Sequence, residues 1–132
     1  EVYSYVSIKA HNAEYFFSEK PLMQMLDYAN GKKIPVWTEL DLLRFLQSRD
    51  EAGFSNFKWS GNLLAFTLNS SVPNKSMLSF LVPMLFNGKT IDRIAANGKT
   101  LNYSTSTIKG TGYALVCIKP GNNYDIEIEY SK

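Results

Sequence analysis

Residues 49–59 read RDEAGFSNFKW, and the character of the chain changes inside this stretch, at Gly53. Before Gly53, runs of β-forming residues alternate with runs whose apolar residues recur at helical spacing. After Gly53 no run has helical spacing, and turn signals recur about every eight to twelve residues, a spacing typical of small all-β domains. The sequence therefore predicts an α+β protein in two parts, residues 1–53 and residues 54–132.

The first part is expected to be a short βαβα segment. Residues 2–10 are rich in β-formers, and residues 33–37 are a short apolar run typical of a buried strand, although Pro35 favours a strand start or an edge. Residues 18–29 and 38–49 carry apolar residues at helical spacing. Two parallel strands need cover on both faces and edges, so this segment should either pack on the second part or belong to a larger sheet.

The second part is expected to form seven to eight antiparallel strands. Asn87-Gly88 and Asn97-Gly98 are the strongest kind of short hairpin signal. Residues 124–130 alternate apolar and acidic residues, which indicates one buried and one solvated face. Residues 77–86 are the most apolar run and predict a central strand, with Pro83 marking a bulge or its end. About seven strands over roughly 80 residues predict an immunoglobulin-like β-sandwich.

Composition narrows the expected partners and cofactors. Fourteen basic and twelve acidic residues give a net charge of +2, a balance that predicts neither a nucleic-acid nor a membrane partner. The single cysteine, Cys117, excludes a disulfide within this chain. One histidine and one distant cysteine do not predict a zinc site of the usual type, although sites for hard cations built from Asp and Glu alone stay open. No metal or cofactor is expected in this chain.

Four residues are candidates for a functional site. His11 follows the first predicted strand, where α/β enzymes place catalytic groups, and a histidine there could act as an acid or base. The structural alternative for His11 is a loop histidine bonded to the backbone. Trp37 and Trp59 could stack on sugar rings or serve only in packing. Tyr15 opens an aromatic run that forms either core cover or the wall of a substrate cleft.

Several segments together resemble polysaccharide deacetylase-like proteins. The strand that ends in His11-Asn12 and the stretch from Ile34 to Asp50 resemble the end of the catalytic barrel of that family. The β-sandwich that follows this barrel in some bacterial members resembles residues 54–62, 64–68, 84–86, 94–98 and 108–113. The resemblance covers nearly the whole chain.

The resemblance implies metal-dependent removal of acetyl groups from N-acetylated sugar polymers in a distorted (β/α) barrel. In the family an Asp and two His from earlier strands hold a divalent metal, and those motifs are not in this sequence. His11 resembles the late-strand histidine that serves as general acid, although the residues flanking it depart from the family's leucine-rich pattern. Trp37 would then lie near the end of the barrel's last strand.

On this resemblance the chain is the C-terminal fragment of a carbohydrate-active hydrolase and is inactive by itself. A first residue of Glu1 instead of Met also predicts a fragment. The sandwich would be an accessory module that binds glycan or acts as a spacer. The expected partners are a carbohydrate polymer and the remainder of the barrel, and the expected location is secreted, periplasmic or at the cell surface. The alternative is a self-contained, non-catalytic interaction or structural module.

Overall fold

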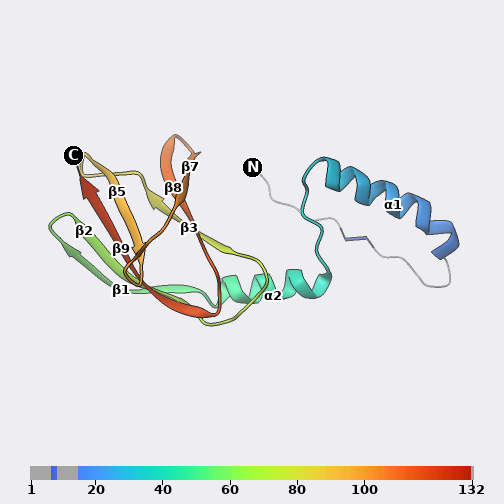
Figure 1. The fold of residues 1–132 in the computed structure, drawn as a ribbon, viewed down its shortest axis with the longest axis horizontal. Coiled ribbons are helices and arrows are strands. Elements are labelled where there is room, and N and C mark those ends of the chain that lie inside the picture. Colours follow the sequence, from blue (N-terminus) through green and yellow to red (C-terminus); the bar gives the residue numbers. More distant parts are fainter. Residues whose placement is uncertain (1–6, 9–14, 132) are drawn as a thin grey trace. The chain divides into compact units, whose positions relative to one another are not determined.

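A computed structural model describes residues 7–8 and 15–131 of the 132-residue chain. Its fold is α+β: within the described residues two helices precede nine strands, and every strand pair is antiparallel (Figure 1). Helix α1 spans Tyr15–Gly31 and helix α2 spans Glu39–Asp50. The chain divides into two compact units, Glu1–Thr38 and Glu39–Lys132, so α2 belongs to the unit that contains the strands.

The first unit contains α1, which covers the helix predicted at residues 18–29 and begins three residues earlier. The strand predicted at residues 33–37 is not found, because these residues form a turn and an irregular segment. Pro35 lacks a backbone N–H, and a β-rich run becomes a strand only where a neighbouring strand offers its backbone groups. Of the strand predicted at residues 2–10, only Ser7 and Ile8 are described, and neither is in a strand.

The second unit contains two sheets. Its strands are β1 (Gly53–Ser60), β2 (Leu63–Ser70), β3 (Leu78–Pro83), β4 (Leu85–Phe86), β5 (Lys89–Ala96), β6 (Lys99–Thr100), β7 (Tyr103–Ile108), β8 (Thr111–Ile118) and β9 (Asn122–Ser131). The first sheet has the order β1-β2-β9-β5-β4, with β6 paired to β5, and the second has the order β3-β8-β7. Both sheets are curved in Figure 1.

Strand β9 shows the alternation that the sequence predicts. Ile126, Ile128 and Tyr130 are buried, with the two isoleucines fully shielded from solvent, whereas Asp125 is exposed on the opposite face. Side chains from both sheets join these residues in one apolar cluster: Phe66, Leu68, Leu78, Phe80, Val82, Ile91, Ile94, Ala96, Ala114, Val116 and Ile118. Because each fully buried large apolar side chain contributes about 1.5–3 kcal/mol, this shared cluster is the main term that holds the two sheets together.

The two Asn-Gly hairpins are confirmed. Asn87 and Gly88 have φ values of 50° and 74° and connect β4 to β5, and Asn97 and Gly98 have φ values of 49° and 75° and connect β5 to β6. Two consecutive residues at positive φ form a tight turn whose twist matches that of the strands on either side. Asparagine and glycine tolerate this conformation best.

Residues 77–86 do not form the single central strand that the sequence predicts. Strand β3 ends at Pro83, as expected, but β3 is an edge of the second sheet, and the chain continues as β4 in the first sheet. Met84 makes the link, because its N–H donates to the carbonyl of Gly112 and its carbonyl accepts from the N–H of Ile91. The chain therefore leaves the second sheet directly after Pro83, which has no backbone N–H to donate to a neighbouring strand.

Helix α2 is attached to the strands by packing and by one buried hydrogen bond. Ser48 is almost completely buried, and its hydroxyl donates to the carbonyl of Val72 at 2.8 Å. Phe45 and, just after the helix, Ala52 pack against the apolar cluster. A buried hydroxyl needs such a partner, so the Ser48 bond fixes the helix against the loop that connects β2 to β3.

Candidate binding surface

The residues that the sequence singles out fall in different parts of the chain. His11 lies outside the described residues, and Tyr15 is the first residue of α1. Trp37 lies in the segment between the helices and is 41% exposed, and Trp59 lies in β1 and is 44% exposed. Trp37 and Trp59 belong to different compact units, so the surface described below is built on Trp59 alone.

A bulge in β1 determines which side chains accompany Trp59. Phe54 pairs with Leu68 and Trp59 with Leu64, and the register between these pairs shifts by one residue near Asn56. Asn56 has a φ of 55°, a conformation that asparagine tolerates. Residues five apart on a regular strand point to opposite faces, but the extra residue places Phe54 and Trp59 on the same face.

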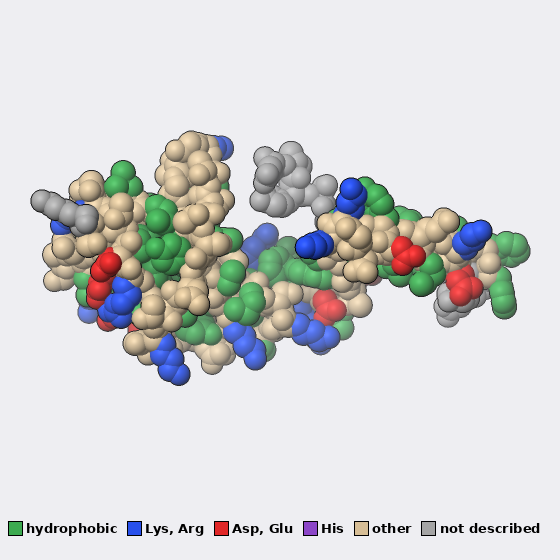
Figure 2. Space-filling view, turned by 45° about the horizontal axis from the view of Figure 1, so that its top comes forward, with side chains coloured by type: hydrophobic (Ala, Val, Ile, Leu, Met, Phe, Trp, Pro, Cys, Tyr) green, Lys and Arg blue, Asp and Glu red, His purple; other side chains and the backbone are tan. Residues whose placement is uncertain are grey.

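The result is a row of four partly exposed rings, called here the aromatic row: Phe54, Phe57, Trp59 and, from β4, Phe86. Their exposed fractions are 51%, 62%, 44% and 42% respectively. Figure 2 shows one face of the molecule, on which hydrophobic side chains reach the surface among the strands. Four large rings exposed to this degree on one unit form a surface suited to contact with a partner or ligand.

Buried rings support both ends of the aromatic row. The ring centres of Phe54 and Phe57 lie 5.6 Å and 5.3 Å from that of the buried Phe66. At the other end Trp59 lies 4.7 Å from Phe86, and the two rings lie 5.7 Å and 6.1 Å from that of Tyr130. Ring pairs at these separations attract each other, so the exposed rings have little freedom to turn.

Polar groups lie beside the Trp59 end of the row. The indole N–H of Trp59 donates to the carbonyl of Gly61 at 3.1 Å, which fixes the plane of the ring. Asn62 accepts from the backbone N–H of Tyr130 with its carbonyl and from the ammonium group of Lys89 with its side-chain oxygen. An exposed indole is therefore accompanied by an amide and an ammonium group that can bind hydroxyl groups.

Burial affects the chemistry of the tyrosine beneath the row. Tyr130 is 3% exposed, and its hydroxyl donates to the carbonyl of Pro83 at 3.1 Å. Because the phenolate would lose its hydration, burial raises the pKa of Tyr130 above its usual value. Tyr130 therefore stays neutral near pH 7 and serves as a support for the two outer rings.

The opposite face of the first sheet is polar. Arg93 donates to Glu129 at 2.5 Å, and this hydrogen bond lowers the pKa of Glu129 and raises that of Arg93. The hydroxyl of Thr67 links Asn56 to Asp125, accepting from the first at 3.3 Å and donating to the second at 3.2 Å. These polar side chains hydrogen-bond one another on the surface, as is usual for the solvated face of a sheet.

Three further observations bear on function. Among the described residues, no group of three or more His, Cys, Asp or Glu side chains is placed to hold a metal ion. Neither helix of the described chain is both long and apolar enough to cross a bilayer. Comparisons with protein-family models, with curated proteins and with solved structures each found no match. The function is therefore inferred from the residues and their arrangement.

Sequence reasoning found Trp59 but missed the other three rings of the row. Phe54 lies at an odd spacing from Trp59, and only the bulge brings the two together. Phe86 lies after Pro83, beyond the point where the chain changes sheets. Two signals were available. Phe57 lies two residues before Trp59, a spacing that places both on one face of a strand, and Asn56 tolerates positive φ inside a β-forming run.

Proposed function

We propose that the chain is the C-terminal part of a carbohydrate-active, polysaccharide deacetylase-like protein. In this proposal residues 1–38 belong to the end of the barrel, and residues 39–132 are an immunoglobulin-like sandwich, with α2 packed on it, that serves as an accessory glycan-binding or spacer module. The observation that carries glycan binding is the partly exposed Trp59–Phe86 ring pair beside Asn62 and Lys89.

The chemistry of sugars fits this end of the aromatic row. A sugar ring has an apolar face of C–H groups and a rim of hydroxyl groups, so it needs a flat apolar partner and a few polar ones. The exposed indole of Trp59, held by Gly61 and Tyr130, provides the flat partner. The amide of Asn62 and the ammonium group of Lys89 provide the polar partners.

The proposed parent protein supplies what this chain lacks. Its earlier strands would hold the divalent metal, and the remainder of the barrel would cover the first unit. His11 would be the general acid of the intact enzyme, and Tyr15 and Trp37 would line its substrate cleft. The isolated chain is then inactive, and its partner is a carbohydrate polymer met outside the cytoplasm, whether the parent is secreted, periplasmic or attached to the cell surface.

Calorimetric titration with chito-oligosaccharides and other β-linked oligosaccharides tests the proposal. We expect saturable binding by the natural chain and a loss of at least about tenfold in affinity on Trp59→Ala, because a central stacking residue is worth more than about 1 kcal/mol. Trp59→Phe, which keeps a ring against Tyr130, should retain part of the affinity. Leu81→Ala is the matched control, since Leu81 is also 44% exposed but lies on β3 of the other sheet.

Two results would count against the proposal. Absence of binding to every oligosaccharide by the folded chain would remove the glycan-binding role, as would equal losses from Trp59→Ala and Leu81→Ala. Release of acetate from an N-acetylated oligosaccharide after addition of a divalent metal would contradict the proposed inactivity of the isolated chain. Thermal unfolding of each variant confirms that a loss of binding is not a loss of fold.

The alternative, a self-contained interaction module, makes a different prediction about the apolar side chains of the first unit. A self-contained protein should leave no large apolar patch exposed. Within α1, Phe16 and Phe17 are 92% and 87% exposed. In the fragment proposal the missing part of the barrel would cover these side chains, whereas in a self-contained module other residues of this chain would cover them.

A further inference from the structure

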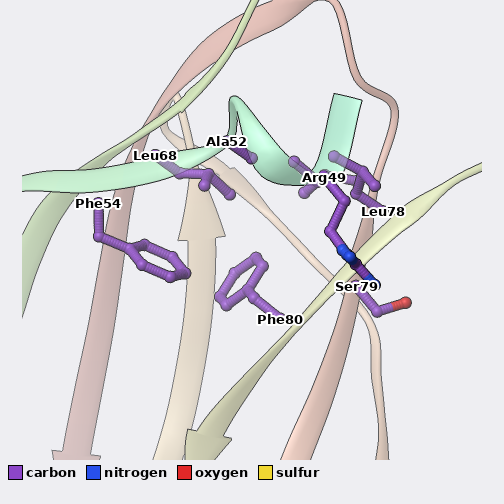
Figure 3. Close-up of a pocket in the computed structure, with 8 residues that line it drawn as sticks. Arg49, Ala52, Phe54, Leu68, Leu78, Ser79 and Phe80 are labelled. Atoms are coloured by element: carbon purple, nitrogen blue, oxygen red, sulfur yellow. The ribbon is translucent and has the colours of Figure 1, made fainter. Parts of the chain in front are cut away.

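A pocket of about 160 Å³ lies where the C-terminal end of α2 meets both sheets (Figure 3). It is called here the helix-end pocket. Its lining comes from the helix end, from β1 and β2 of the first sheet, and from β3 and β8 of the second. All of these elements belong to the second compact unit. The pocket is therefore a feature of the strand-rich unit itself.

The interior of the helix-end pocket is apolar. Six of its eight lining residues are apolar, and two of them, Phe54 and Phe80, meet edge to face with their ring centres 6.1 Å apart. Figure 3 shows these two rings next to each other. An apolar protein cavity of about 150 Å³ stays dry and accepts benzene. A pocket of this size and lining therefore suits a single six-membered ring.

Arg49 and Ser79 are the two polar residues of the lining. In Figure 3 the Arg49 side chain reaches from the helix toward Ser79. Nε and one terminal nitrogen of Arg49 contact the same oxygen of Asp50, at 3.3 Å and 3.1 Å. Both side chains of this pair are more than half exposed, so water screens the attraction between them. A second carboxylate can therefore compete for the guanidinium group at little cost.

We propose that the helix-end pocket binds a small aromatic monocarboxylate, a compound with one six-membered ring and one carboxylate. The ring would fill the pocket against the contacting rings of Phe54 and Phe80, and the carboxylate would pair with Arg49. A guanidinium group matches a carboxylate better than any neutral group. This site goes beyond glycan binding, and Phe54 is the one residue that it shares with the aromatic row.

Titration followed by methyl resonances tests the site, with benzoate as the probe and benzyl alcohol as a neutral compound of similar size. Benzoate should shift the methyl signals of Ala52, Leu68 and Ile118 in a saturable way. Benzyl alcohol should bind at least about threefold more weakly, because it lacks the charge that Arg49 recognises. Arg49→Gln should lower the benzoate affinity to that of the alcohol, whereas Arg44→Gln, the same charge change elsewhere on α2, should leave it unchanged.

Filling the pocket provides a second test. Ala52→Leu places three further carbons in the pocket and should abolish the benzoate-induced shifts. If that variant fails to fold, the benzoate affinities of Arg49→Gln and Arg44→Gln are sufficient to test the proposal. The proposal is overturned if benzoate shifts none of these methyl signals in the natural chain, or if Arg49→Gln and Arg44→Gln bind it equally well. Neither result would affect glycan binding at Trp59, so the two proposals fail independently.

Discussion

Tyr130 connects the core of the strand-rich unit to its exposed rings. It lies on β9, the strand between β2 and β5, and its hydroxyl donates to Pro83 at the end of β3 in the other sheet. Its ring also supports Trp59 and Phe86. One side chain thus bonds the two sheets together at the place where the aromatic row is partly open to solvent.

The raised pKa of Tyr130 predicts a loss of stability at alkaline pH. The neutral phenol is favoured in the folded state, so its contribution is complete below the unfolded pKa of about 10 and is lost as pH rises through the folded pKa. Tyr130→Phe should reduce stability at pH 7 by about 1 kcal/mol through the lost hydrogen bond. We expect the difference in free energy of unfolding between the two proteins, measured in urea, to stay constant up to about pH 9 and to narrow as the pH rises through about 10.

The comparison of the two proteins is its own control, because every other ionisable group is the same in both. Two stability curves that stay parallel up to pH 11 would contradict the assignment to Tyr130.

At the scale of elements, the bulge in β1 determines the composition of the aromatic row. Asn56→Val disfavours the bulge without changing the length of the strand, because a β-branched residue does not tolerate a φ of 55°. On a regular strand of this length Phe54 and Trp59 lie five residues apart and point to opposite faces. The hairpin turn at Gly61 holds Trp59, so Phe54 would lose its contacts with Phe66 and Phe80. We expect the substitution to reduce the free energy of unfolding by about 1–3 kcal/mol, as measured by urea titration with tryptophan fluorescence.

Asn56→Gly is the matched control for this substitution, because glycine also accepts a φ of 55° and keeps the bulge. Its effect should stay below about 1 kcal/mol. A valine variant no less stable than the glycine variant would show that the bulge does not set the position of Phe54.

Elements could be predicted where the local signal and the tertiary environment agree. The alternation of residues 124–130 and the Asn-Gly pairs are local signals of strong specificity, and both are confirmed. The prediction at residues 33–37 is wrong because strand formation depends on a neighbouring strand, which composition cannot show. Residues 77–86 looked like one strand, since a change of sheet at Met84 leaves no signal beyond Pro83.

The candidate sites required the structure for the same reason. Trp59 was visible as a single residue, but its ring partners come from β4 and β9, which are distant in sequence. The helix-end pocket combines residues from Arg49 to Ile118. No spacing rule connects such residues, because their proximity depends on the order of strands in two sheets.

At the scale of the whole molecule, the attachment of α2 to the strands predicts which N-terminal residues can be removed without loss of stability in the strand-rich unit. Residues 39–132 contain Ser48, Phe45 and Ala52 with all their strand partners. This segment should unfold in urea in one cooperative transition, with the same midpoint as the strand-rich unit of the full chain. Residues 54–132 lack these contacts and should be less stable by about 2–5 kcal/mol.

Ser48→Ala in the longer segment separates the hydrogen bond from the packing, and it should account for about 1 kcal/mol of this difference. Equal midpoints for residues 39–132 and 54–132 would show that α2 is not part of the folded unit and would place the domain boundary at Gly53.

The position of β9 between β2 and β5 has a consequence for synthesis of the protein. All the other strands leave the ribosome before β9, yet the first sheet cannot form in its native order until β9 separates β2 from β5. Until then β2 and β5 each present an unpaired edge, and such edges are open to pairing with the wrong strand. Folding of this unit is therefore expected to finish after translation of β9, and to be slow, because its pairings join residues far apart in the chain.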